Sequence, residues 1–552
     1  MKARVFLNKL TAFLLTFAVC VTFSGCTKKS VEESTSNAEN TTTIEAISPD
    51  EAFSERDLSG EYDEGEATYI TLDEDKILVD GEGVDVSDST ATITKEGTYI
   101  VSGTITEGQL KVNVGDEEKV QLVLDGVNMS CESTAPIYVL NADKVFVTLA
   151  EGSENNLEVT EEFVQIDDNN IDGVIFAKDD VTINGSGSLN ISSVSGHGIV
   201  CKNDLKITGG TIDITSAEDG LQGEDSVRIA DGTITVNAGD DGIHSDGNLL
   251  IIGGTVKVTE SEEGLEGQII TITDGDITVV SKDDGLNATS GSSSSGDAGT
   301  AKMQEFGDMS KEGTPPEMGE NGGTPPDMTD GERFKGHGFR GDMASGDGRA
   351  FKKEMGSQDA REFKNNMASG NAKGFGGGMM DSDESAVINI SGGTINIDAG
   401  GDGVDSNGYI NIFGGEIYVS GPTNNGNASL DYGISATITG GVVVMAGSSG
   451  MAENFSDDST QGVILANVDN QSEDATITLT DSSGNEIVSY TPLKSYNSVI
   501  ISSPEITSGS NYLLTTGQTE TSITMDSLIY GSGTGMSGMM RGDHKGDIGE
   551  QL

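Results

Sequence analysis

The central part of the chain repeats itself, and this repeat restricts the possible folds more than any other feature. A Gly that follows an acidic residue or a His recurs at intervals of 22, 22, 22 and 21 residues, at Gly198, Gly220, Gly242, Gly264 and Gly285. A second Gly gives the same period at Gly210, Gly232, Gly254 and Gly275, and the pattern resumes at Gly393, Gly403 and Gly415. Because two independent registers share one period, the segment is a repeat architecture.

Each repeat contains three short runs in which Ile, Val or Leu alternates with polar residues, as in 211–215. Alternation with a period of two predicts half-buried strands, and Gly at fixed positions supplies the turns between them. Strands that cannot pair within their own repeat must pair with the repeats above and below. The sequence therefore predicts an all-β fold, a right-handed parallel β-helix with about 22 residues per rung.

Equivalent apolar positions of successive repeats should stack into ladders inside such a fold. One predicted ladder consists of Ile212, Ile234, Val256, Ile277 and Ile395. The other consists of Leu221, Ile243, Leu265, Leu286 and Val404. These residues are assigned to packing and to no other function.

Composition divides the rest of the chain. Residues 289–385 are rich in Ser, Gly, Met and Pro, carry mixed charge and lack an apolar period, which predicts disorder. The predicted divisions are a signal peptide (1–25), a disordered polar linker (26–67), an N-terminal cap with irregular first coils (68–172), the β-helix (173–288), the disordered insertion (289–385), the continued β-helix (386–450), a β-rich C-terminal cap (451–530) and a disordered tail (531–552).

The N-terminus predicts export. Basic residues precede a short apolar run, and the segment 23–26 (FSGC) resembles a bacterial lipobox in which Cys26 becomes the lipid-attachment site. We therefore expect a protein on the extracellular face of the bacterial cell membrane, held there through its lipid anchor only. An ordinary cleaved signal peptide is the alternative. Cys131 and Cys201 are expected to be two separate buried thiols.

The charge balance limits the possible partners. The chain has 31 Lys and Arg residues against 91 Asp and Glu residues, a net charge of −60. Such a surface repels nucleic acid, so no nucleic-acid partner is expected. It attracts cations, and carboxylate oxygens are the ligands that Ca²⁺ prefers.

The acids gather before the turn Gly of each repeat, often two in a row. Stacked in a β-helix, they would form columns of like charge about 4.8 Å apart, which destabilises a sheet and raises carboxyl pKa values. Bound Ca²⁺ would remove both effects, with Glu224, Asp225, Asp246, Glu266 and Asp405 as partner acids on the same side. Plain Asp-Gly turns with solvated carboxylates are the alternative. The predicted calcium ligands are Glu218, Asp219, Asp240, Asp241, Asp246, Glu262, Glu263, Asp283, Asp284 and Asp402.

No catalytic residues are assigned, because nothing in the sequence resembles a catalytic triad. His197 and His244 lie at or beside the acidic turns and are interpreted as polar surface residues. No metal-binding motif of the His/Cys kind is present, so zinc is not expected.

Several motifs together resemble one family. They are the lipobox, the segments 207–212 (ITGGTI), 241–247 (DGIHSDG) and 262–267 (EEGLEG), the Gly/Met-rich insertion, and 419–423 (VSGPT) followed by 430–432 (LDY). Over roughly residues 70–510 the chain resembles the clostridial carbohydrate-binding domain-containing lipoproteins. The resemblance implies a parallel β-helix similar to family 9 pectate lyases, with bound calcium, that binds cellulose or acidic sugars without established lyase activity.

The expected function is therefore calcium-assisted binding of a plant or cell-wall polysaccharide. The chain has no Trp, so Tyr409, Tyr418 and Tyr432, together with Phe413, are the aromatic candidates for sugar contact. Packing of these rings between coils is the alternative. Two alternatives come from other classes. One is a calcium-dependent polysaccharide lyase, with Lys202 or Lys257 as the base. The other is a structural or adhesive surface spacer that binds no sugar.

Overall fold

The computed structural model describes residues 47–74, 76–290 and 382–533. Within these ranges the chain is almost entirely β-strand, with one short 3₁₀ helix, η1 (Pro49–Glu51). No helix there is long and apolar enough to cross a membrane. Cys26, the signal peptide, the C-terminal tail after residue 533 and nearly all of the predicted insertion lie outside the described residues.

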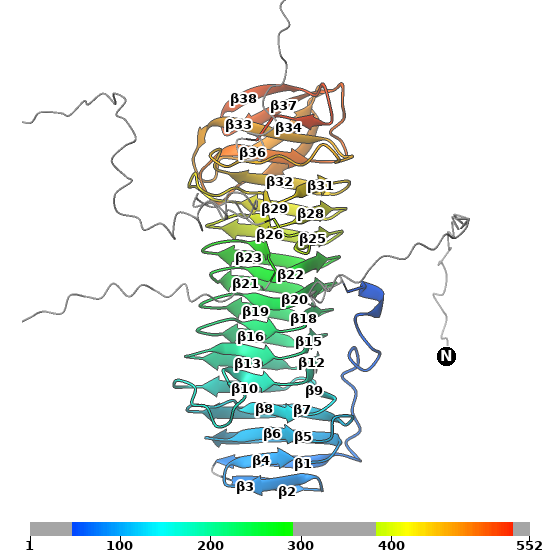
Figure 1. The fold of residues 1–552 in the computed structure, drawn as a ribbon, viewed down its shortest axis with the longest axis vertical. Helices are drawn as coiled ribbons and strands as arrows, with labels where there is room; N and C mark the ends of the chain where they lie inside the picture. The colour runs from blue at the N-terminus through cyan, green and yellow to red at the C-terminus, as the bar shows by residue number, and fades with distance from the viewer. Residues whose placement is uncertain (1–46, 75, 291–381, 534–552) are drawn as a thin grey trace, which may run out of the picture. The chain divides into compact units, whose positions relative to one another are not determined.

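Most strands belong to one large sheet in which a strand typically pairs, in parallel, with the third strand further along the chain. This pattern produces three columns of strands, and a set of three consecutive strands, one from each column, is called a coil here. Figure 1 shows the coils stacked in chain order. The all-β class and the mostly parallel sheet are thus confirmed. The right-handed β-helix with a fixed rung length stays a prediction.

The first column begins with β4 and carries the acidic turns. Its strands are β4 (Thr90–Ile93), β6 (Gln109–Asn113), β8 (Ile137–Asn141), β11 (Gly173–Ala177), β14 (His197–Cys201), β17 (Leu221–Gly223), the first part of β20 (Ile243–Ile251), the first part of β22 (Leu265–Ile272), β24 (Leu286–Ala288), β27 (Val404–Ser406) and β30 (Asp431–Tyr432).

The second and third columns complete each coil. The second contains β1 (Thr68–Glu74), β5 (Gly97–Thr106), β7 (Lys119–Cys131), β9 (Lys144–Leu149), β12 (Asp180–Gly185), β15 (Asp204–Ile207), β18 (Ser226–Ile229), the later parts of β20 and β22, β25 (Val387–Ile390), β28 (Tyr409–Ile412) and β31 (Ser435–Ile438). The third contains the end of β7, β10 (Glu154–Val159), β13 (Ser188–Ser193), β16 (Thr211–Thr215), β19 (Thr233–Asn237), β21 (Thr255–Glu260), β23 (Asp276–Ser281), β26 (Thr394–Ala399), β29 (Glu416–Ser420) and β32 (Val442–Gly447).

The core consists of the two predicted apolar ladders and their neighbours. Ile212 pairs in register with Ile234, and Ile234 with Val256. Leu221 pairs with Ile243, and Ile243 with Leu265, so partners in both ladders are 22 residues apart in this part of the chain. All ten ladder residues are fully buried. Both ladders are therefore confirmed.

The two ends of the stack are antiparallel. At the N-terminal end β2 (Lys76–Asp80) pairs with β1, and β3 (Val84–Ser87) pairs with β4. At the C-terminal end β36 (Tyr496–Ser502) pairs with both β32 and β33 (Val463–Gln471). A separate four-stranded sheet contains β34 (Ile477–Asp481), β35 (Glu486–Tyr490), β37 (Asn511–Thr516) and β38 (Thr519–Thr524), while β39 (Ile529–Tyr530) pairs with β33. Both ends thus cover the exposed edge of a stacked sheet.

Residues 47–62, here called the strap, run along the side of the coils. From η1 the strap follows the stack toward β1 (Figure 1), and its backbone carbonyls accept hydrogen bonds from Arg228, Asn184 and Gln121. Asp57 of the strap is almost fully buried. A disordered linker was predicted over 26–67, whereas the strap has defined contacts because Asp57 pairs with Lys144 and Lys206.

The two cysteines of the described chain are separate. Cys131 ends β7 and Cys201 ends β14, and both are buried and free. Burial raises the pKa of both thiols to about 12. The prediction of two buried thiols is confirmed.

Candidate cation-binding site

The turn that precedes each first-column strand is held in place by backbone contacts between coils. The Gly220 amide donates to the Asp241 carbonyl, and the Gly242 amide donates to the Glu263 carbonyl, both at 2.9 Å. A Cβ added to Gly220 would lie 2.7 Å from the carbonyl oxygen of Gly242. The repeated Gly is therefore required by the close approach of the coils, and it keeps the preceding acid at the same place in every coil.

The two acids of each turn have different surroundings. The outer acids Glu218, Asp240, Glu262 and Asp283 are exposed, as is Asp246. The inner acids are buried or half-buried, and they are called the acidic ladder here: Asp219, Asp241, Glu263, Asp284 and Asp402. Three residues after each ladder acid comes a side chain on the same side of the strand, namely Gln222, His244, Glu266, Asn287 and Asp405.

Ladder acids use one carboxylate oxygen to cap the next turn. Asp219 Oδ1 accepts from the Asp241 amide at 3.0 Å, and Asp284 Oδ1 accepts from the Asp402 amide at 2.6 Å. Asp402 Oδ1 accepts from the Ala428 amide in the same way. Turn chemistry therefore explains one oxygen of each of these three acids. The other oxygen of Asp219 lies 3.2 Å from His197 Nδ1, and the other oxygens of Asp284 and Asp402 are left to be explained.

At the C-terminal end of the ladder three carboxylates converge. Asp284, Asp402 and Asp405 each have an oxygen within 4.8 Å of the other two. Asp405 is 7% exposed, and its Oδ1 is buried without a hydrogen-bond partner among the described residues. In the same part of the chain none of the three forms an ion pair with a Lys, Arg or His. This end has the oxygen ligands for a hard cation and no cation of its own from the described chain.

Burial and mutual repulsion weaken ionisation of these acids. Burial raises the pKa of Asp402, and the charges of Asp284 and Asp431 add to it, giving a value of about 7. The pKa of Asp284 is raised to about 6, again by burial and then by Asp283 and Asp431. Burial and the charge of Asp431 hold the pKa of Asp405 well above its ordinary value. A cation among these groups would reverse the shifts.

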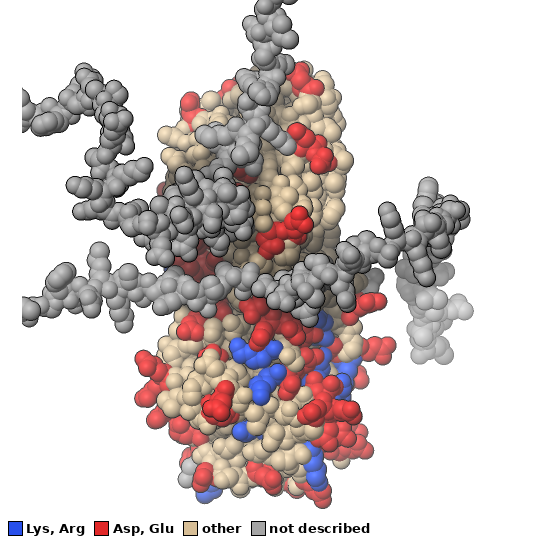
Figure 2. Space-filling view, in the orientation of Figure 1, with Lys and Arg blue, Asp and Glu red and all other residues tan. Residues whose placement is uncertain are grey.

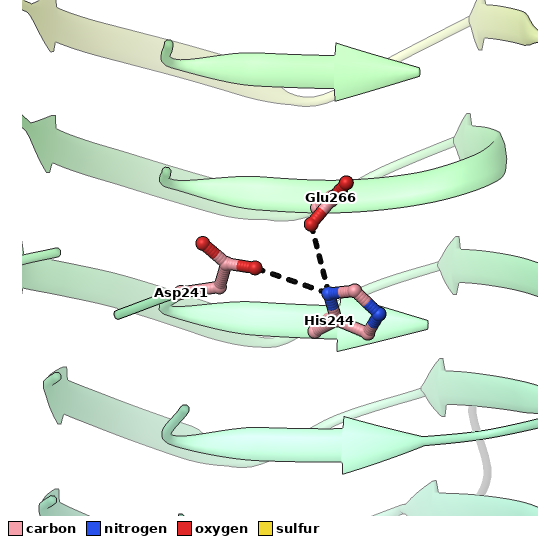
Figure 3. Close-up of side chains that lie close together, drawn as sticks. All are labelled: Asp241, His244 and Glu266. Carbon is pink, nitrogen blue, oxygen red and sulfur yellow. Dashed lines mark hydrogen bonds and ion pairs between the residues drawn. The ribbon is translucent and has the colours of Figure 1, made fainter. Parts of the chain in front are cut away.

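Toward the N-terminal end histidines lie beside the acidic ladder. His244 Nδ1 lies 3.0 Å from Asp241 Oδ2 and 2.8 Å from Glu266 Oε2, as Figure 3 shows. Its Nε2 lies 3.0 Å from Asp246 Oδ1. His197 takes the place of a ladder acid, since its Nδ1 accepts from the Asp219 amide at 3.1 Å, while its Nε2 lies 2.9 Å from Glu218 Oε2.

The interpretation of His197 as a surface residue is wrong, because this residue is buried and its side chain is 11% exposed. His244 is half-buried, with its side chain 21% exposed. Sequence reasoning missed them because their partners come from another coil or from the far side of the turn. A signal for this arrangement was present in the sequence. His244 and Asp405 each follow a ladder acid by three residues, and this spacing places their side chains beside that acid.

The three candidate tyrosines do not form one surface. Tyr409, Tyr418 and Tyr432 lie on β28, β29 and β30, which belong to the second, third and first columns. Tyr418 stacks on Tyr490 of the C-terminal sheet with ring centroids 5.3 Å apart. Tyr432 donates to the Asn454 carbonyl at 2.8 Å and lines a hollow of about 510 Å³.

Comparisons with known proteins agree with the motifs. Residues 87–310 match the family model described as carbohydrate-binding domain-containing protein. A carbohydrate-binding domain-containing protein of Acetivibrio thermocellus is 43% identical over 148 residues, which are 26% of this chain and 52% of the relative. The chain thus spans about half the length of that relative. A solved polysaccharide lyase-like protein from C. thermocellum, studied as a gadolinium derivative, is 36% identical, with 40% of this chain and 88% of that chain covered and a TM-score of 0.34. The resemblance to the carbohydrate-binding domain-containing protein family is therefore confirmed over residues 87–310.

Proposed function

We propose that this protein is a lipid-anchored, carbohydrate-binding protein of the bacterial cell surface. It binds plant or cell-wall polysaccharide, cellulose or acidic sugars, with Ca²⁺ held at the C-terminal end of the acidic ladder. The family match over residues 87–310 supports carbohydrate binding, and the lipobox ending at Cys26 supports the anchor. The register of the core ladders supports a right-handed parallel β-helix with about 22 residues per rung.

The observation that carries the calcium part of the proposal is the Asp405 carboxylate. A buried charge without a hydrogen bond costs several kcal/mol, so a chain that keeps one is expected to supply a counter-ion. The chain around Asp405 supplies two more carboxylates, from Asp284 and Asp402, and no described cation. Ca²⁺ takes six to eight oxygen ligands in flexible geometry, and the donors here are all oxygen. Asp284, Asp402 and Asp405 would therefore hold the ion.

Calcium also accounts for how so acidic a protein could bind an acidic glycan. With a net charge of −60, the protein repels a uronate polymer in solution. An ion held by three carboxylates would lower this repulsion locally and leave coordination positions for sugar oxygens. Figure 2 shows acidic residues spread over much of the visible face, with Lys and Arg gathered in its lower half. The local ion, and not the overall charge, would attract the glycan.

The test is a pull-down of the soluble chain starting after Cys26, with cellulose and with polygalacturonate, each in calcium and in chelator. We expect calcium-dependent retention that Asp405→Asn abolishes. Asp73→Asn is the matched control, because Asp73 is an exposed acid at the opposite end of the stack. Retention that is equal in chelator would contradict the role of calcium.

Two other results would change the proposal. A protein that stays in solution with every glycan would favour the surface spacer. Formation of unsaturated sugar ends, followed by ultraviolet absorbance, would favour the lyase.

A further inference from the structure

His244 has an arrangement of neighbours that the calcium proposal does not explain. Its Nδ1 faces two carboxylate oxygens at once, Glu266 Oε2 at 2.8 Å and Asp241 Oδ2 at 3.0 Å. Asp241 precedes β20 in the same coil, whereas Glu266 lies on β22 of the next coil, in register with His244. Figure 3 shows Asp241 and Glu266 approaching the same ring nitrogen of His244.

The other ring nitrogen has a fixed partner. Nε2 lies 3.0 Å from Asp246 Oδ1, so the Nε2–H donates to this carboxylate. A carboxylate that accepts from the far nitrogen of a histidine selects the tautomer in which the near nitrogen carries a lone pair. The same pairing orients histidines that bind metal ions in proteins.

A single proton does not satisfy the near side of the ring. One N–H on Nδ1 can point well at only one oxygen, so Asp241 and Glu266 share a further proton in a hydrogen bond between them. The Asp241 side chain is 10% exposed and the Glu266 side chain is 16% exposed, so water screens neither of them well. A divalent ion between the imidazole and the two carboxylates would replace this proton and contact all three groups together.

The distances are a little shorter than such an ion needs. Nitrogen and oxygen ligands lie about 2.0–2.2 Å from Zn²⁺, and tetrahedral ligands are then about 3.3–3.6 Å apart. His244 Nδ1 lies 2.8 Å and 3.0 Å from the two carboxylate oxygens, so the side chains would have to move apart by about half an ångström to admit the ion. All three ligand atoms lie within 4.8 Å of one another. In addition, Gln222, the register partner of His244 in the preceding coil, has a buried Oε1 without a hydrogen bond among the described residues.

The ligand types select the metal class. Ca²⁺ and Mg²⁺ prefer oxygen ligands alone, whereas an imidazole nitrogen with carboxylates suits first-row transition metals. We propose that Asp241, His244 and Glu266 form a binding site for a divalent transition-metal ion of the Zn²⁺ kind. Asp246 positions the imidazole, and the site is separate from the calcium site at Asp284, Asp402 and Asp405. The inference does not depend on carbohydrate binding.

The sequence pattern could not indicate this site. A zinc motif is recognised when its ligands recur at short spacing, but here the third ligand comes from the next coil. Asp241 and His244 alone are an ordinary polar pair.

The test is titration of the soluble chain after Cys26 with Zn²⁺ in the presence of excess Ca²⁺, followed by calorimetry and by metal analysis after dialysis. We expect one equivalent of tightly held zinc. His244→Gln should abolish it, and Asp246→Asn should weaken it by about 10- to 100-fold. His197→Gln is the matched control, because His197 lies in the same column and should leave zinc binding unchanged. Circular dichroism checks that each variant folds.

A second readout places the ion on a particular atom. The chain has four histidines, so a sample labelled with ¹⁵N-histidine gives few signals. Zinc should shift the Nδ1 resonance of His244 and leave that of His197 in place. Asp405→Asn should lose calcium binding and keep zinc binding. Zinc that fails to bind, that binds His244→Gln equally, or that excess calcium displaces would overturn the proposal and leave an imidazolium–carboxylate network only.

Discussion

Like charges lie close together in two regions of this protein, and the chain neutralises them differently. On the second column, Lys206 is in register with Arg228, and Lys144 lies nearby. The strap places Asp57 against both lysines, at 3.1 Å from Lys144 Nζ and 3.6 Å from Lys206 Nζ. On the first column, the acidic ladder has His197 and His244 toward one end and no described cation at the other.

The pKa values follow this difference. Burial opposes ionisation of Asp57, but hydrogen bonds from Ser54 and Thr182 and the charge of Lys144 lower its pKa well below the ordinary value. Burial also acts on Asp402, where no cation compensates, and its pKa is raised to about 7. Where the counter-ion is a side chain of the protein, the stability of the region does not depend on dissolved ions. Where the counter-ion comes from solution, the stability of the region depends on the ion concentration, as it does in an ion-binding site.

The largest effect is expected from Asp57→Ala. Removing the carboxylate leaves the buried Lys206 without its ion pair and Lys144 with only Asp180 at 3.5 Å, which should lower the free energy of unfolding by about 3–5 kcal/mol. Urea denaturation measures the loss, and Glu55→Ala, at an exposed position of the strap, is the control. The loss should be the same in calcium and in chelator. Rescue by calcium would break the distinction between the two regions.

Calcium removal should have the next largest effect. Calcium at about 100 times its dissociation constant should raise the free energy of unfolding by about 2.7 kcal/mol. Thermal melts in calcium and in chelator measure this difference. Asp405→Asn should reduce it strongly, while Asp73→Asn should not. An equal calcium response in both variants would place the ion elsewhere.

The two regions should respond to pH with opposite signs. In chelator, Asp402 and Asp284, whose pKa values are raised to about 7 and about 6, bind protons more tightly when folded than when unfolded. The free energy of unfolding should therefore fall as the pH rises from about 4 to 7. The lowered pKa of Asp57 stabilises the fold above about pH 4, and this contribution is lost as the pH falls further.

Denaturation in urea across this pH range measures both effects. Calcium should reduce the change in the free energy of unfolding between pH 4 and 7 and leave the change below about pH 4 unaltered. Asp57→Asn should remove much of the change below about pH 4. A curve that calcium does not alter would argue against ion binding by these carboxylates.

The smallest effect is expected from His197→Asp. The new carboxylate can still accept from the Asp219 amide, so the turn is kept, but it extends the column of like charge. We expect a loss of about 1 kcal/mol in chelator. His197→Asn, which keeps an acceptor without the charge, should lose less. Equal losses in both variants would mean that charge does not matter at this position.

The sequence predicted those features that repeat. Ile234 and Ile243 occupy the expected ladders. Alternating apolar residues and turn glycines determine the structure locally, and both recur in each coil. The strap was not predicted, because its partner Thr182 is 125 residues from Asp57 and no period relates the two segments.

The acidic ladder was predicted as a row of equivalent sites, and the structure makes its members unequal. The pattern indicated pairs of acids, but it could not tell that Asp241 is buried while Asp240 is exposed. The pattern also did not indicate that Glu266 lies beside His244, because the two residues come from adjacent coils. The tyrosines were chosen by residue type alone, and residue type does not fix the column on which a side chain lies.

The strap also determines how the protein would carry a mechanical load. Its contacts follow one another along the stack, from Ile47 at Asn248, through Ala52 at Arg228 and Asp57 at Lys144, to Glu61 at Gln121. Were the chain tethered to a membrane at Cys26, tension would reach the Ile47 contact first and the coils last. The strap could then peel one contact at a time, absorbing a pull while the stacked strands stayed intact.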